Sequence, residues 1–345
     1  MLGPRLTIDD QSEPSGKVRT LADLAKIAGV SAGTVSRALA GKELVNKTTR
    51  DRIQLLARQH GFRPNQMASN LRTQRTGVIR VVIPLGHDRR QHISDPFFMT
   101  LLGHLADELT ECGYELLLSR VIPDQDPDWL ERMTNSGMSD GTIVIGQSDQ
   151  FDTIERVAQD YTPLVAWGNY RKGQAHCAVG SDNRLGGRLA AEKLVASGAR
   201  KIAFFGDTAG IEIASRLEGA RKVAEIVHLP THLAVDEMDA DIASNLDSMD
   251  PAIDGILAAS DLIAMACMRQ LRERGIDVPG DIQVIGFDDI PAASQMSPPL
   301  TTIKQDIAVG AAAMVDILKR RLAGEKTGSV VMPPRLIERG TTRIG

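Results

Sequence analysis

"RTLADLAKIAGVSAGTVSRALAG", residues 19–41, predicts two short helices separated by a tight turn. The apolar residues of the first helix are spaced three and four apart, which places them on one face: Leu21, Leu24, Ala25 and Ala28. Gly29 supplies the left-handed backbone conformation that ends many helices, and Val30 points back to the core. Ser31 is a natural N-cap for the second helix.

The second helix has two different faces. Its inward positions are Val35, Ala38 and Leu39, and the outward positions that remain are Ala32, Gly33, Ser36 and Arg37. A third helix follows, capped by Asn46 or Thr48, with Ile53, Leu55, Leu56 and the later Phe62 as its apolar contribution. This order and spacing predict a helix-turn-helix module whose second helix enters the major groove of DNA.

The charge of the chain is unevenly distributed. Residues 17–76 contain twelve Lys and Arg but three Asp and Glu, which gives this segment a net charge of about +9. Since the whole chain has a net charge of −4, the rest of the chain carries about −13. A compact basic module on an acidic body is typical of nucleic-acid binding. The alternatives are a solvated charged face and a helical hairpin that packs for stability alone.

The body of the chain, from Val78 onward, alternates strands with helices. Its apolar strand-like runs are "VIRVVIP", "YELLLSR", "GTIVIG", "PLVAWG", "KIAFFG", "DGILAA" and "IQVIGF", with helices expected near 97–112, 128–136, 151–160, 183–197, 212–226 and 260–274. Apolar strands separated by helices are typical of parallel sheets covered on both faces. Two such halves predict two doubly wound subdomains with a cleft between them.

The motifs together resemble those of the LacI/GalR family of transcriptional regulators. The matching stretches are "LADLAKIAGVSAGTVSRAL", "RPNQMASNLRTQRTGVIRVVIP", "VGSDNRLGGRLAAEKL", "SRLEG", "DIQVIGFDDIP" and "PPLTTIKQD". The resemblance implies a small all-α helix-turn-helix domain joined by a hinge helix to an α/β core like that of type I periplasmic binding proteins. The implied parts are a disordered tail (1–17), the DNA-binding domain (18–63), the hinge helix (64–76) and the effector-binding and dimerisation domain (77–345). Within the last part, the N-subdomain takes about 77–177 plus 305–324, and the C-subdomain takes about 178–304 plus 325–345, including the final strand.

The resemblance also assigns DNA contacts. Ala32, Gly33 and Arg37 are expected to read base edges, and an arginine makes a bidentate contact with guanine. Contacts to phosphates are expected from Ser31, Thr34, Ser36, Asn46 and Thr49. In the hinge helix, the implied contacts are Asn65, Ala68, Leu71 and Arg72. Leu71 would wedge into the minor groove and kink the duplex, as apolar wedges of other minor-groove binders do.

Candidate effector ligands lie beyond the carboxyl ends of the strands, where open α/β sheets bind ligands. That rule selects residues near Gln147, Trp167, Glu212, Ser260, Asp261 and Asp288. The resemblance adds Arg216 and implies that Arg216 and Asp288 bind polar groups of the effector. Phe97, Phe98 or Trp167 is expected to stack on the apolar face of a sugar. The alternatives are that Phe97 and Phe98 belong to the core, that Asp288 caps a turn, and that Arg216 bridges to a carboxylate. Ser260–Asp261 stands where the family usually has Asn-Asp.

Other classes of protein lack support in the sequence. Asp288 and Asp289 are adjacent on a strand end and point to opposite sides, so they form no acid/base pair. The histidines show no metal spacing, no phosphate-binding GxxxxGK[ST] loop is present, and Cys112, Cys177 and Cys267 are far apart and odd in number. We therefore expect neither an enzyme nor a metal site nor a cofactor. No apolar run approaches the ~20 residues that span a bilayer, and the N-terminus does not read as a signal peptide.

The expected function is a cytoplasmic, homodimeric repressor of a carbohydrate-utilisation operon. It would bind a pseudo-palindromic operator in double-stranded DNA and respond to a small sugar-like effector in the cleft, without any membrane association. The alternative is a sugar-binding protein of the same core fold with no transcriptional role. The basic module and the missing signal peptide favour the regulator.

Overall fold

The computed structural model describes residues 18, 20–39, 44–62, 75–84, 93–123, 126–147 and 150–344. Contacts between Cα atoms divide the chain into two units, residues 1–76 and 77–345. The predicted tail (1–17) lies outside the described residues, as do the hinge positions Asn65, Ala68, Leu71 and Arg72. Each unit is described by itself below.

The described residues of the smaller unit form three helices, which are α1 (Leu21–Ala28), α2 (Ala32–Leu39) and α3 (Lys47–Gln59). A capping box begins α1: the Thr20 hydroxyl accepts a hydrogen bond from the Asp23 amide at 3.1 Å, and the Asp23 carboxylate accepts one from the Thr20 amide at 3.0 Å. This box follows from the "TLAD" spacing, which the sequence analysis did not use. Gly29 ends α1 with a φ of 64°, as predicted.

The core of the smaller unit confirms most of the predicted inward positions. Leu24, Val35 and Ile53 are fully buried, and Phe62 packs beside them. The prediction for Leu55 was wrong, because its side chain is 51% exposed and Ala57 takes the buried place. Ile53 and Ala57 are four residues apart and share a helix face, whereas Leu55 lies two positions from Ile53 and points away.

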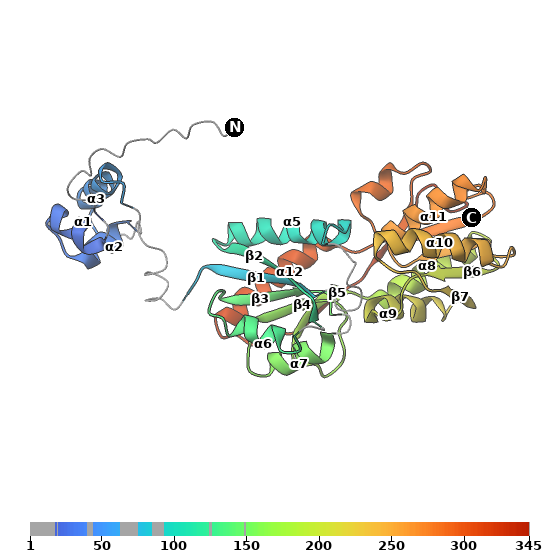
Figure 1. The fold of residues 1–345 in the computed structure, drawn as a ribbon, viewed down its shortest axis with the longest axis horizontal. Coiled ribbons are helices and arrows are strands. Elements are labelled where there is room, and N and C mark those ends of the chain that lie inside the picture. The colour runs from blue at the N-terminus through green and yellow to red at the C-terminus, as the bar shows by residue number, and fades with distance from the viewer. Residues whose placement is uncertain are drawn as a thin grey trace, which may run out of the picture. The chain divides into compact units, whose positions relative to one another are not determined.

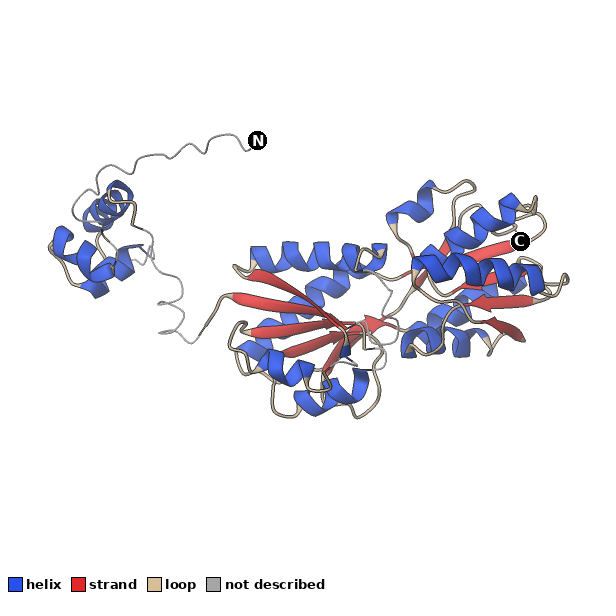
Figure 2. Ribbon diagram, viewed as in Figure 1, coloured by secondary structure: helices blue, strands red, loops and turns tan. Residues whose placement is uncertain are grey.

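The larger unit contains two six-stranded sheets (Figure 2). In spatial order, the first sheet consists of β2 (Glu115–Val121), β1 (Val78–Pro84), β3 (Gly141–Ile145), β4 (Leu164–Trp167), β5 (Cys177–Ser181) and β11 (Val330–Met332), all parallel. The second consists of β7 (Ile226–Leu229), β6 (Ile202–Phe205), β8 (Gly255–Ala258), β9 (Gln283–Asp288), β10 (Thr301–Lys304) and β12 (Arg335–Ile337). Only β12 is antiparallel to its neighbour among these described strands.

Helices cover both faces of each sheet (Figure 1). The first sheet packs against α5 (Pro96–Glu111) and α12 (Ile307–Leu322) on one face, and against α6 (Trp129–Thr134) and α7 (Phe151–Ala158) on the other. The second sheet carries α8 (Asn183–Ala196) and α9 (Ile211–Ala220) on one side, and α10 (Val235–Ser248) and α11 (Asp261–Glu273) on the other. A short 3-10 helix, η3 (Pro291–Gln295), follows β9. The predicted fold class is therefore confirmed.

The division between the two sheets differs from the expected one. Residues 178–181 and 330–332 were expected in the second half, but β5 and β11 pair with each other in the first sheet. Only β12 of the final "VVMPPRLIER" segment joins the second sheet. Pro333 and Pro334 separate the two strands, and proline ends a strand because it lacks an amide donor. Earlier in the chain, α9 ends at Ala220 rather than near residue 226, and β7 begins at Ile226, where the helix was expected to end.

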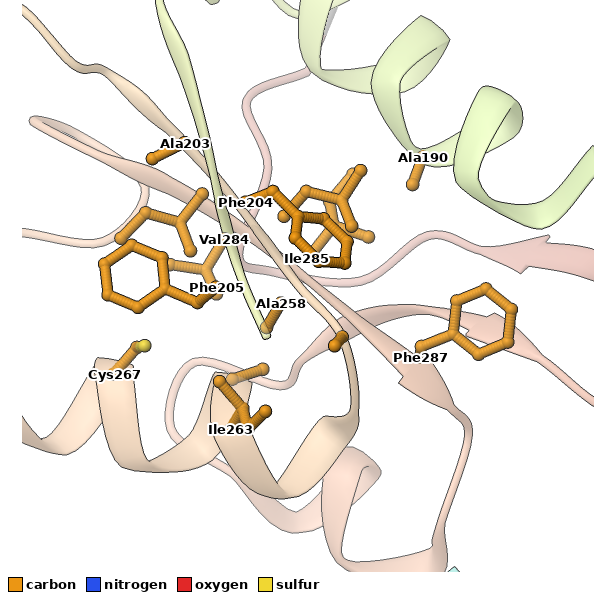
Figure 3. Close-up of a cluster of buried hydrophobic side chains, with 14 of the residues drawn as sticks. Ala190, Ala203, Phe204, Phe205, Ala258, Ile263, Cys267, Val284, Ile285 and Phe287 are labelled. Atoms are coloured by element: carbon orange, nitrogen blue, oxygen red, sulfur yellow. The ribbon is translucent and has the colours of Figure 1, made fainter. Parts of the chain in front are cut away.

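The second sheet has apolar side chains on both faces (Figure 3). Phe205 points towards the helix that carries Ile263 and Cys267, whereas Phe204 points to the opposite side, that of Ala190. Such alternation follows from the two-residue period of a strand, so a continuous apolar run serves both layers of helices.

Helices α8 and α9 cross with their backbones in close contact. A Cβ on Gly187 would lie 1.8 Å from the carbonyl oxygen of Arg216, and one on Gly219 would lie 1.9 Å from that of Arg184. Any side chain at either glycine would therefore force the two helices apart.

Candidate functional site

The outer face of α2 carries the residues predicted to contact DNA. Ala32, Gly33 and Arg37 are exposed, and Thr34 and Ser36 are half-buried. A Cβ on Gly33 would lie 3.8 Å from a terminal nitrogen of Arg37, so the guanidinium extends over the small residues. The face combines one long cation with a surface free of bulky side chains.

Hydroxyl and amide groups occupy the N-termini of α2 and α3. The Ser31 hydroxyl accepts a hydrogen bond from the Thr34 amide at 3.2 Å and pairs with the Thr34 hydroxyl at 2.9 Å. Asn46, rather than Thr48, caps α3, since its Oδ1 accepts from the Thr49 amide at 2.8 Å. Helix N-termini favour anionic groups, which suits the predicted phosphate contacts.

Arg216 lies at the boundary between the two sheets and is buried. Its Nε donates to Oδ1 of Asn183 at 2.8 Å, one terminal nitrogen donates to the carbonyl oxygen of Ala259, and its Cζ lies 3.6 Å from the centroid of the Phe287 ring. The other terminal nitrogen is 3.9 Å from Oδ1 of Asp288. Burial lowers the pKa of Arg216, and the nearby carboxylate of Asp288 opposes that shift. Sequence reasoning did not select Asn183 as a site residue, although it lies within the matching stretch "VGSDNRLGGRLAAEKL".

Asp288 ends β9 and has an unusual backbone with a φ of 121°. The Nε2 of Gln305 donates to its Oδ1 at 2.7 Å. Burial raises the pKa of Asp288 to about 7, although Arg216 and Gln305 favour the charged form. Asp95, the N-cap of α5, adds a negative charge that raises the pKa further. Arg216 thus lies beside the carboxylate of Asp288, as the alternative of a bridge to a carboxylate expects. Gln305 and Asp95 were not selected from the sequence.

Asp261 and Ser260 hold the start of α11 in place. The Asp261 carboxylate is fully buried, accepting from the Thr302 hydroxyl at 2.5 Å and from the Ile290 amide at 2.9 Å. Burial, followed by the charge of Asp288, raises the pKa of Asp261 well above its usual range. The Ser260 hydroxyl caps the helix by accepting from the Ile263 amide at 3.3 Å. Both oxygen atoms of Asp261 are engaged within the protein, which indicates a role in joining β9, β10 and α11.

The three aromatic candidates gather near the N-terminus of α5. The Phe97 ring centroid lies 5.8 Å from those of Phe98 and Trp167. Trp167 is only 4% exposed, and a Cβ on Gly310 of α12 would lie 2.3 Å from its ring. Trp167 is therefore part of the core of the first sheet. Phe97 and Phe98 are half-buried and retain exposed surface.

Gln147 and Glu212 meet at Asn169, which the sequence analysis did not select. Gln147 donates through Nε2 to the Asn169 carbonyl oxygen at 2.9 Å, and Glu212 accepts from the Asn169 amide at 3.3 Å. The Asn169 side chain donates to the Ser215 hydroxyl at 2.7 Å and accepts from Nδ2 of Asn183 at 2.8 Å. Asn169 follows β4 of the first sheet, whereas its partners Glu212, Ser215 and Asn183 belong to α8 and α9. It is therefore a direct polar link between the two halves.

The Asn169 link continues into the first half. The Gln147 Oε1 lies 3.2 Å from Nε2 of the buried His176, whose Nδ1 contacts the carboxylate of Glu155. Burial lowers the pKa of His176, and Glu155 opposes that shift.

The described residues include neither a metal-binding cluster nor a membrane-spanning helix. No group of three or more His, Cys, Asp or Glu side chains in this part of the chain is placed to hold a metal ion. None of the described helices has the length and apolar character needed to cross a membrane.

Comparison with known proteins matches both units. Residues 20–65 match the family described as bacterial regulatory proteins, lacI family, and residues 191–342 match the periplasmic binding protein-like domain. The ribose operon repressor of Bacillus subtilis (strain 168) is 30% identical over 336 residues, which are 94% of this chain and 98% of the relative. A solved complex of the transcriptional regulator CelR with cellobiose has a TM-score of 0.66 and 26% identity, covering 93% of this chain and 99% of that one. The lac repressor dimer bound to operator and the anti-inducer ONPF shares the fold, with a TM-score of 0.82 and 24% identity over 94% of this chain and 99% of that chain.

Proposed function

Because the chain belongs to the LacI family of bacterial regulatory proteins, we propose that it represses transcription of a carbohydrate-utilisation operon. It binds a pseudo-palindromic operator as a homodimer in the cytoplasm, since two-fold symmetry of the protein matches two half-sites of DNA. A small sugar-like effector controls this binding from the boundary between the two sheets. The protein has no catalytic role.

The exposed face of α2 is the observation that carries the proposal. Arg37 is exposed beside Ala32 and Gly33, so its guanidinium is available for a bidentate contact with guanine. The two small residues allow the helix backbone to approach the floor of the major groove. Ser31, Thr34, Asn46 and Thr49 surround two helix N-termini, which bind phosphates without reading sequence.

The chemistry at the boundary supports a neutral, hydroxylated effector. Arg216 and Asp288 offer a donor and an acceptor, while Phe97 and Phe98 offer half-buried aromatic surface for the apolar face of a sugar ring. Glu212 adds a carboxylate nearby, which disfavours a strongly anionic ligand. Similar proteins bear names such as ribose operon repressor and sucrose operon repressor, in keeping with a sugar.

A sugar-binding protein without a transcriptional role is the second candidate, because the larger unit alone has that fold. The basic module argues against it, since a sugar carrier has no need of an exposed arginine on a helix-turn-helix. The two candidates differ in whether the full chain binds DNA sequence-specifically.

A gel-shift experiment tests the proposal. The full-length protein is incubated with the upstream region of its neighbouring operons, with excess competitor DNA and at moderate salt, because salt suppresses non-specific phosphate contacts. We expect a shifted band that persists. A band that disappears with competitor would favour the sugar-binding candidate.

A thermal-shift screen of neutral sugars identifies the effector, because a ligand that binds the native state raises the melting temperature. Neutral mono- and oligosaccharides are expected to raise it and to change the gel shift. If nucleobases alone raise it, the proposed effector class is wrong while the DNA-binding role stands.

A further inference from the structure

A cavity adjoins the boundary between the two sheets and has none of the predicted effector ligands in its wall. Its volume is about 630 Å³, within the range of small-molecule sites. The residues that follow β4, from Asn169 to Lys172, form one wall, and the first residues of α8 together with one face of α9 form the other. Both halves of the larger unit therefore contribute to it.

The α9 residues that line this cavity are distinct from the predicted effector ligands on the same helix. Ile211, Ala214, Ser215 and Glu218 recur at helical spacing and share one face. Glu212 and Arg216 lie one position further along and are turned towards Asn169 and Asp288. The cavity thus lies on a different face of α9 from the effector position and adjoins it, since Asn169 and Asn183 of its wall are hydrogen-bonded to Glu212 and Arg216.

The first wall carries two cations that have no carboxylate partner among the described residues. Arg171 lies over the Phe151 ring, with its Cζ 4.2 Å from the ring centroid, and Lys172 is exposed. The cavity's two acidic groups are already engaged: Glu218 pairs with Arg184, and Asp182 caps α8 by accepting from the Leu185 amide at 2.9 Å. The positive charges of Arg171 and Lys172 are therefore not neutralised by the acidic groups of the cavity.

The wall also holds hydrogen-bonding groups suited to hydroxyls. Ser181 is only 3% exposed, and its hydroxyl has no hydrogen-bond partner among the residues that the structure describes, which is a costly arrangement for a buried polar group. Asn183 and Asn169 also line the cavity, and their carboxamides join its two walls through a hydrogen bond of 2.8 Å. The Ser181 hydroxyl is therefore the group best placed to bind a ligand hydroxyl.

We propose that this cavity binds a small anionic polyol, such as a sugar phosphate, with Arg171 and Lys172 holding the anionic group. Arginine and lysine form charge-assisted hydrogen bonds with phosphate, and the polar walls accept the hydroxylated chain. A ligand seated there contacts both halves of the larger unit at once. This site adds to the effector position proposed for the neutral sugar and uses other side chains to bind its ligand.

Isothermal titration of the full-length protein tests the proposal, with glucose 6-phosphate as the probe at physiological ionic strength. Glucose and inorganic phosphate are the matched half-probes, and sodium sulfate controls for non-specific anion binding. Glucose 6-phosphate is expected to bind at least about tenfold more tightly than either half-probe, because one charged hydrogen bond contributes roughly 1.5 kcal/mol or more. Equal heats with sulfate, or no binding of glucose 6-phosphate, would overturn the proposal.

Variants then locate the bound probe. The double substitution Arg171→Ala/Lys172→Ala should weaken glucose 6-phosphate binding at least about tenfold. It should lower the melting temperature only slightly, since both side chains are exposed and the fold loses only the contact of Arg171 with the Phe151 ring. Lys222→Ala removes an exposed charge from outside the cavity and should bind as the unmodified protein does. Asp288→Asn should also retain the affinity for glucose 6-phosphate. Loss of binding in Asp288→Asn, with binding preserved in the double variant, would place the probe at the effector position and contradict the second site.

Discussion

The outer face of α2 and the boundary between the two sheets both carry functional polar groups, but in opposite states. On α2, Arg37 is exposed and its neighbours are small. At the boundary, Arg216 is buried and bound to Asn183, Ala259, Phe287 and Asp288. The outer face of α2 presents its polar groups to a binding partner. The polar groups at the boundary are hydrogen-bonded within the protein, and a ligand must compete with these bonds.

This difference separates binding from stability. The exposed Arg37 side chain adds little to the stability of the fold, so its removal should affect mainly the binding of DNA. When a buried ionic group is removed, its partners lose their hydrogen bonds, so the unfolding free energy of the larger unit falls. Four experiments test this separation, in order of decreasing effect.

Arg216→Ala should have the largest effect. Removing one member of a buried charged network costs roughly 3–5 kcal/mol of unfolding free energy, because Asp288 and Asn183 lose their partner. Urea unfolding, followed by the fluorescence of the buried Trp129 and Trp167, measures it. Arg221→Ala, at the exposed end of the same helix, should change the free energy by less than about 0.5 kcal/mol. A loss below about 1 kcal/mol for Arg216→Ala would mean that the network relaxes without its cation.

Arg37→Ala should weaken operator binding and leave stability unchanged. A bidentate contact with guanine contributes about 1–3 kcal/mol of discrimination, which corresponds to roughly ten- to a hundredfold in affinity. The ratio of operator to non-specific affinity, measured by competition gel shift, should fall. Arg58→Ala removes the same charge from the exposed end of α3 and should leave that ratio intact. An equal loss on both kinds of DNA for Arg37→Ala would assign its contact to phosphate.

Asp288 should make the stability of the larger unit fall as the pH rises. Its pKa is about 7 in the folded protein and 3.8 as the reference value, so between these values the folded state binds more protons than the unfolded state. The stability from this group is therefore lost progressively from about pH 4 to pH 7, by at most about 1.4 kcal/mol per pH unit.

The control is Asp288→Asn, which keeps the acceptor for Gln305 and suits a positive φ. The difference between the unfolding free energies of the two proteins isolates Asp288, because His176, with its lowered pKa, acts in the opposite direction in both. A difference that stays constant from pH 5 to pH 8 would refute the raised pKa.

Thr20→Ala should have the smallest effect. Loss of an N-cap costs about 1 kcal/mol, here confined to α1 of the smaller unit. Amide hydrogen exchange of α1 should accelerate about fivefold, which corresponds to that free energy. Thr20→Ser retains the capping oxygen and should exchange nearly as slowly as the unmodified protein. Equal exchange in all three proteins would show that the capping box is dispensable.

The same contrast explains what the sequence predicted. The exposed positions of α2 follow from helical periodicity within eight residues, so they were found without knowledge of the rest of the fold. The partners of Arg216 and Asp288 lie up to tens of residues away, and sequence periodicity says nothing about which strand ends meet. Asn183, Gln305 and Asn169 were missed for that reason.

Two single positions illustrate the limit further. Trp167 stands at a strand end, where ligands bind, yet Gly310 leaves room for its ring to pack on α12. Leu55 looks like a core residue by type, but its helix turns it towards solvent. Residue type and strand position predict where a site lies, and contacts over long sequence distances decide which side chains face it.

The glycine crossing of α8 and α9 gives the larger unit a mechanical property. Because Gly187 and Gly219 bring the two backbones into contact, the helices have no layer of flexible side chains in which to absorb a displacement. A displacement of α9 at Arg216 therefore moves α8 with it. Helix α8 begins at Asn183, two residues after β5 ends at Ser181. Because this connection is so short, a displacement of α8 also moves the end of β5 in the first sheet.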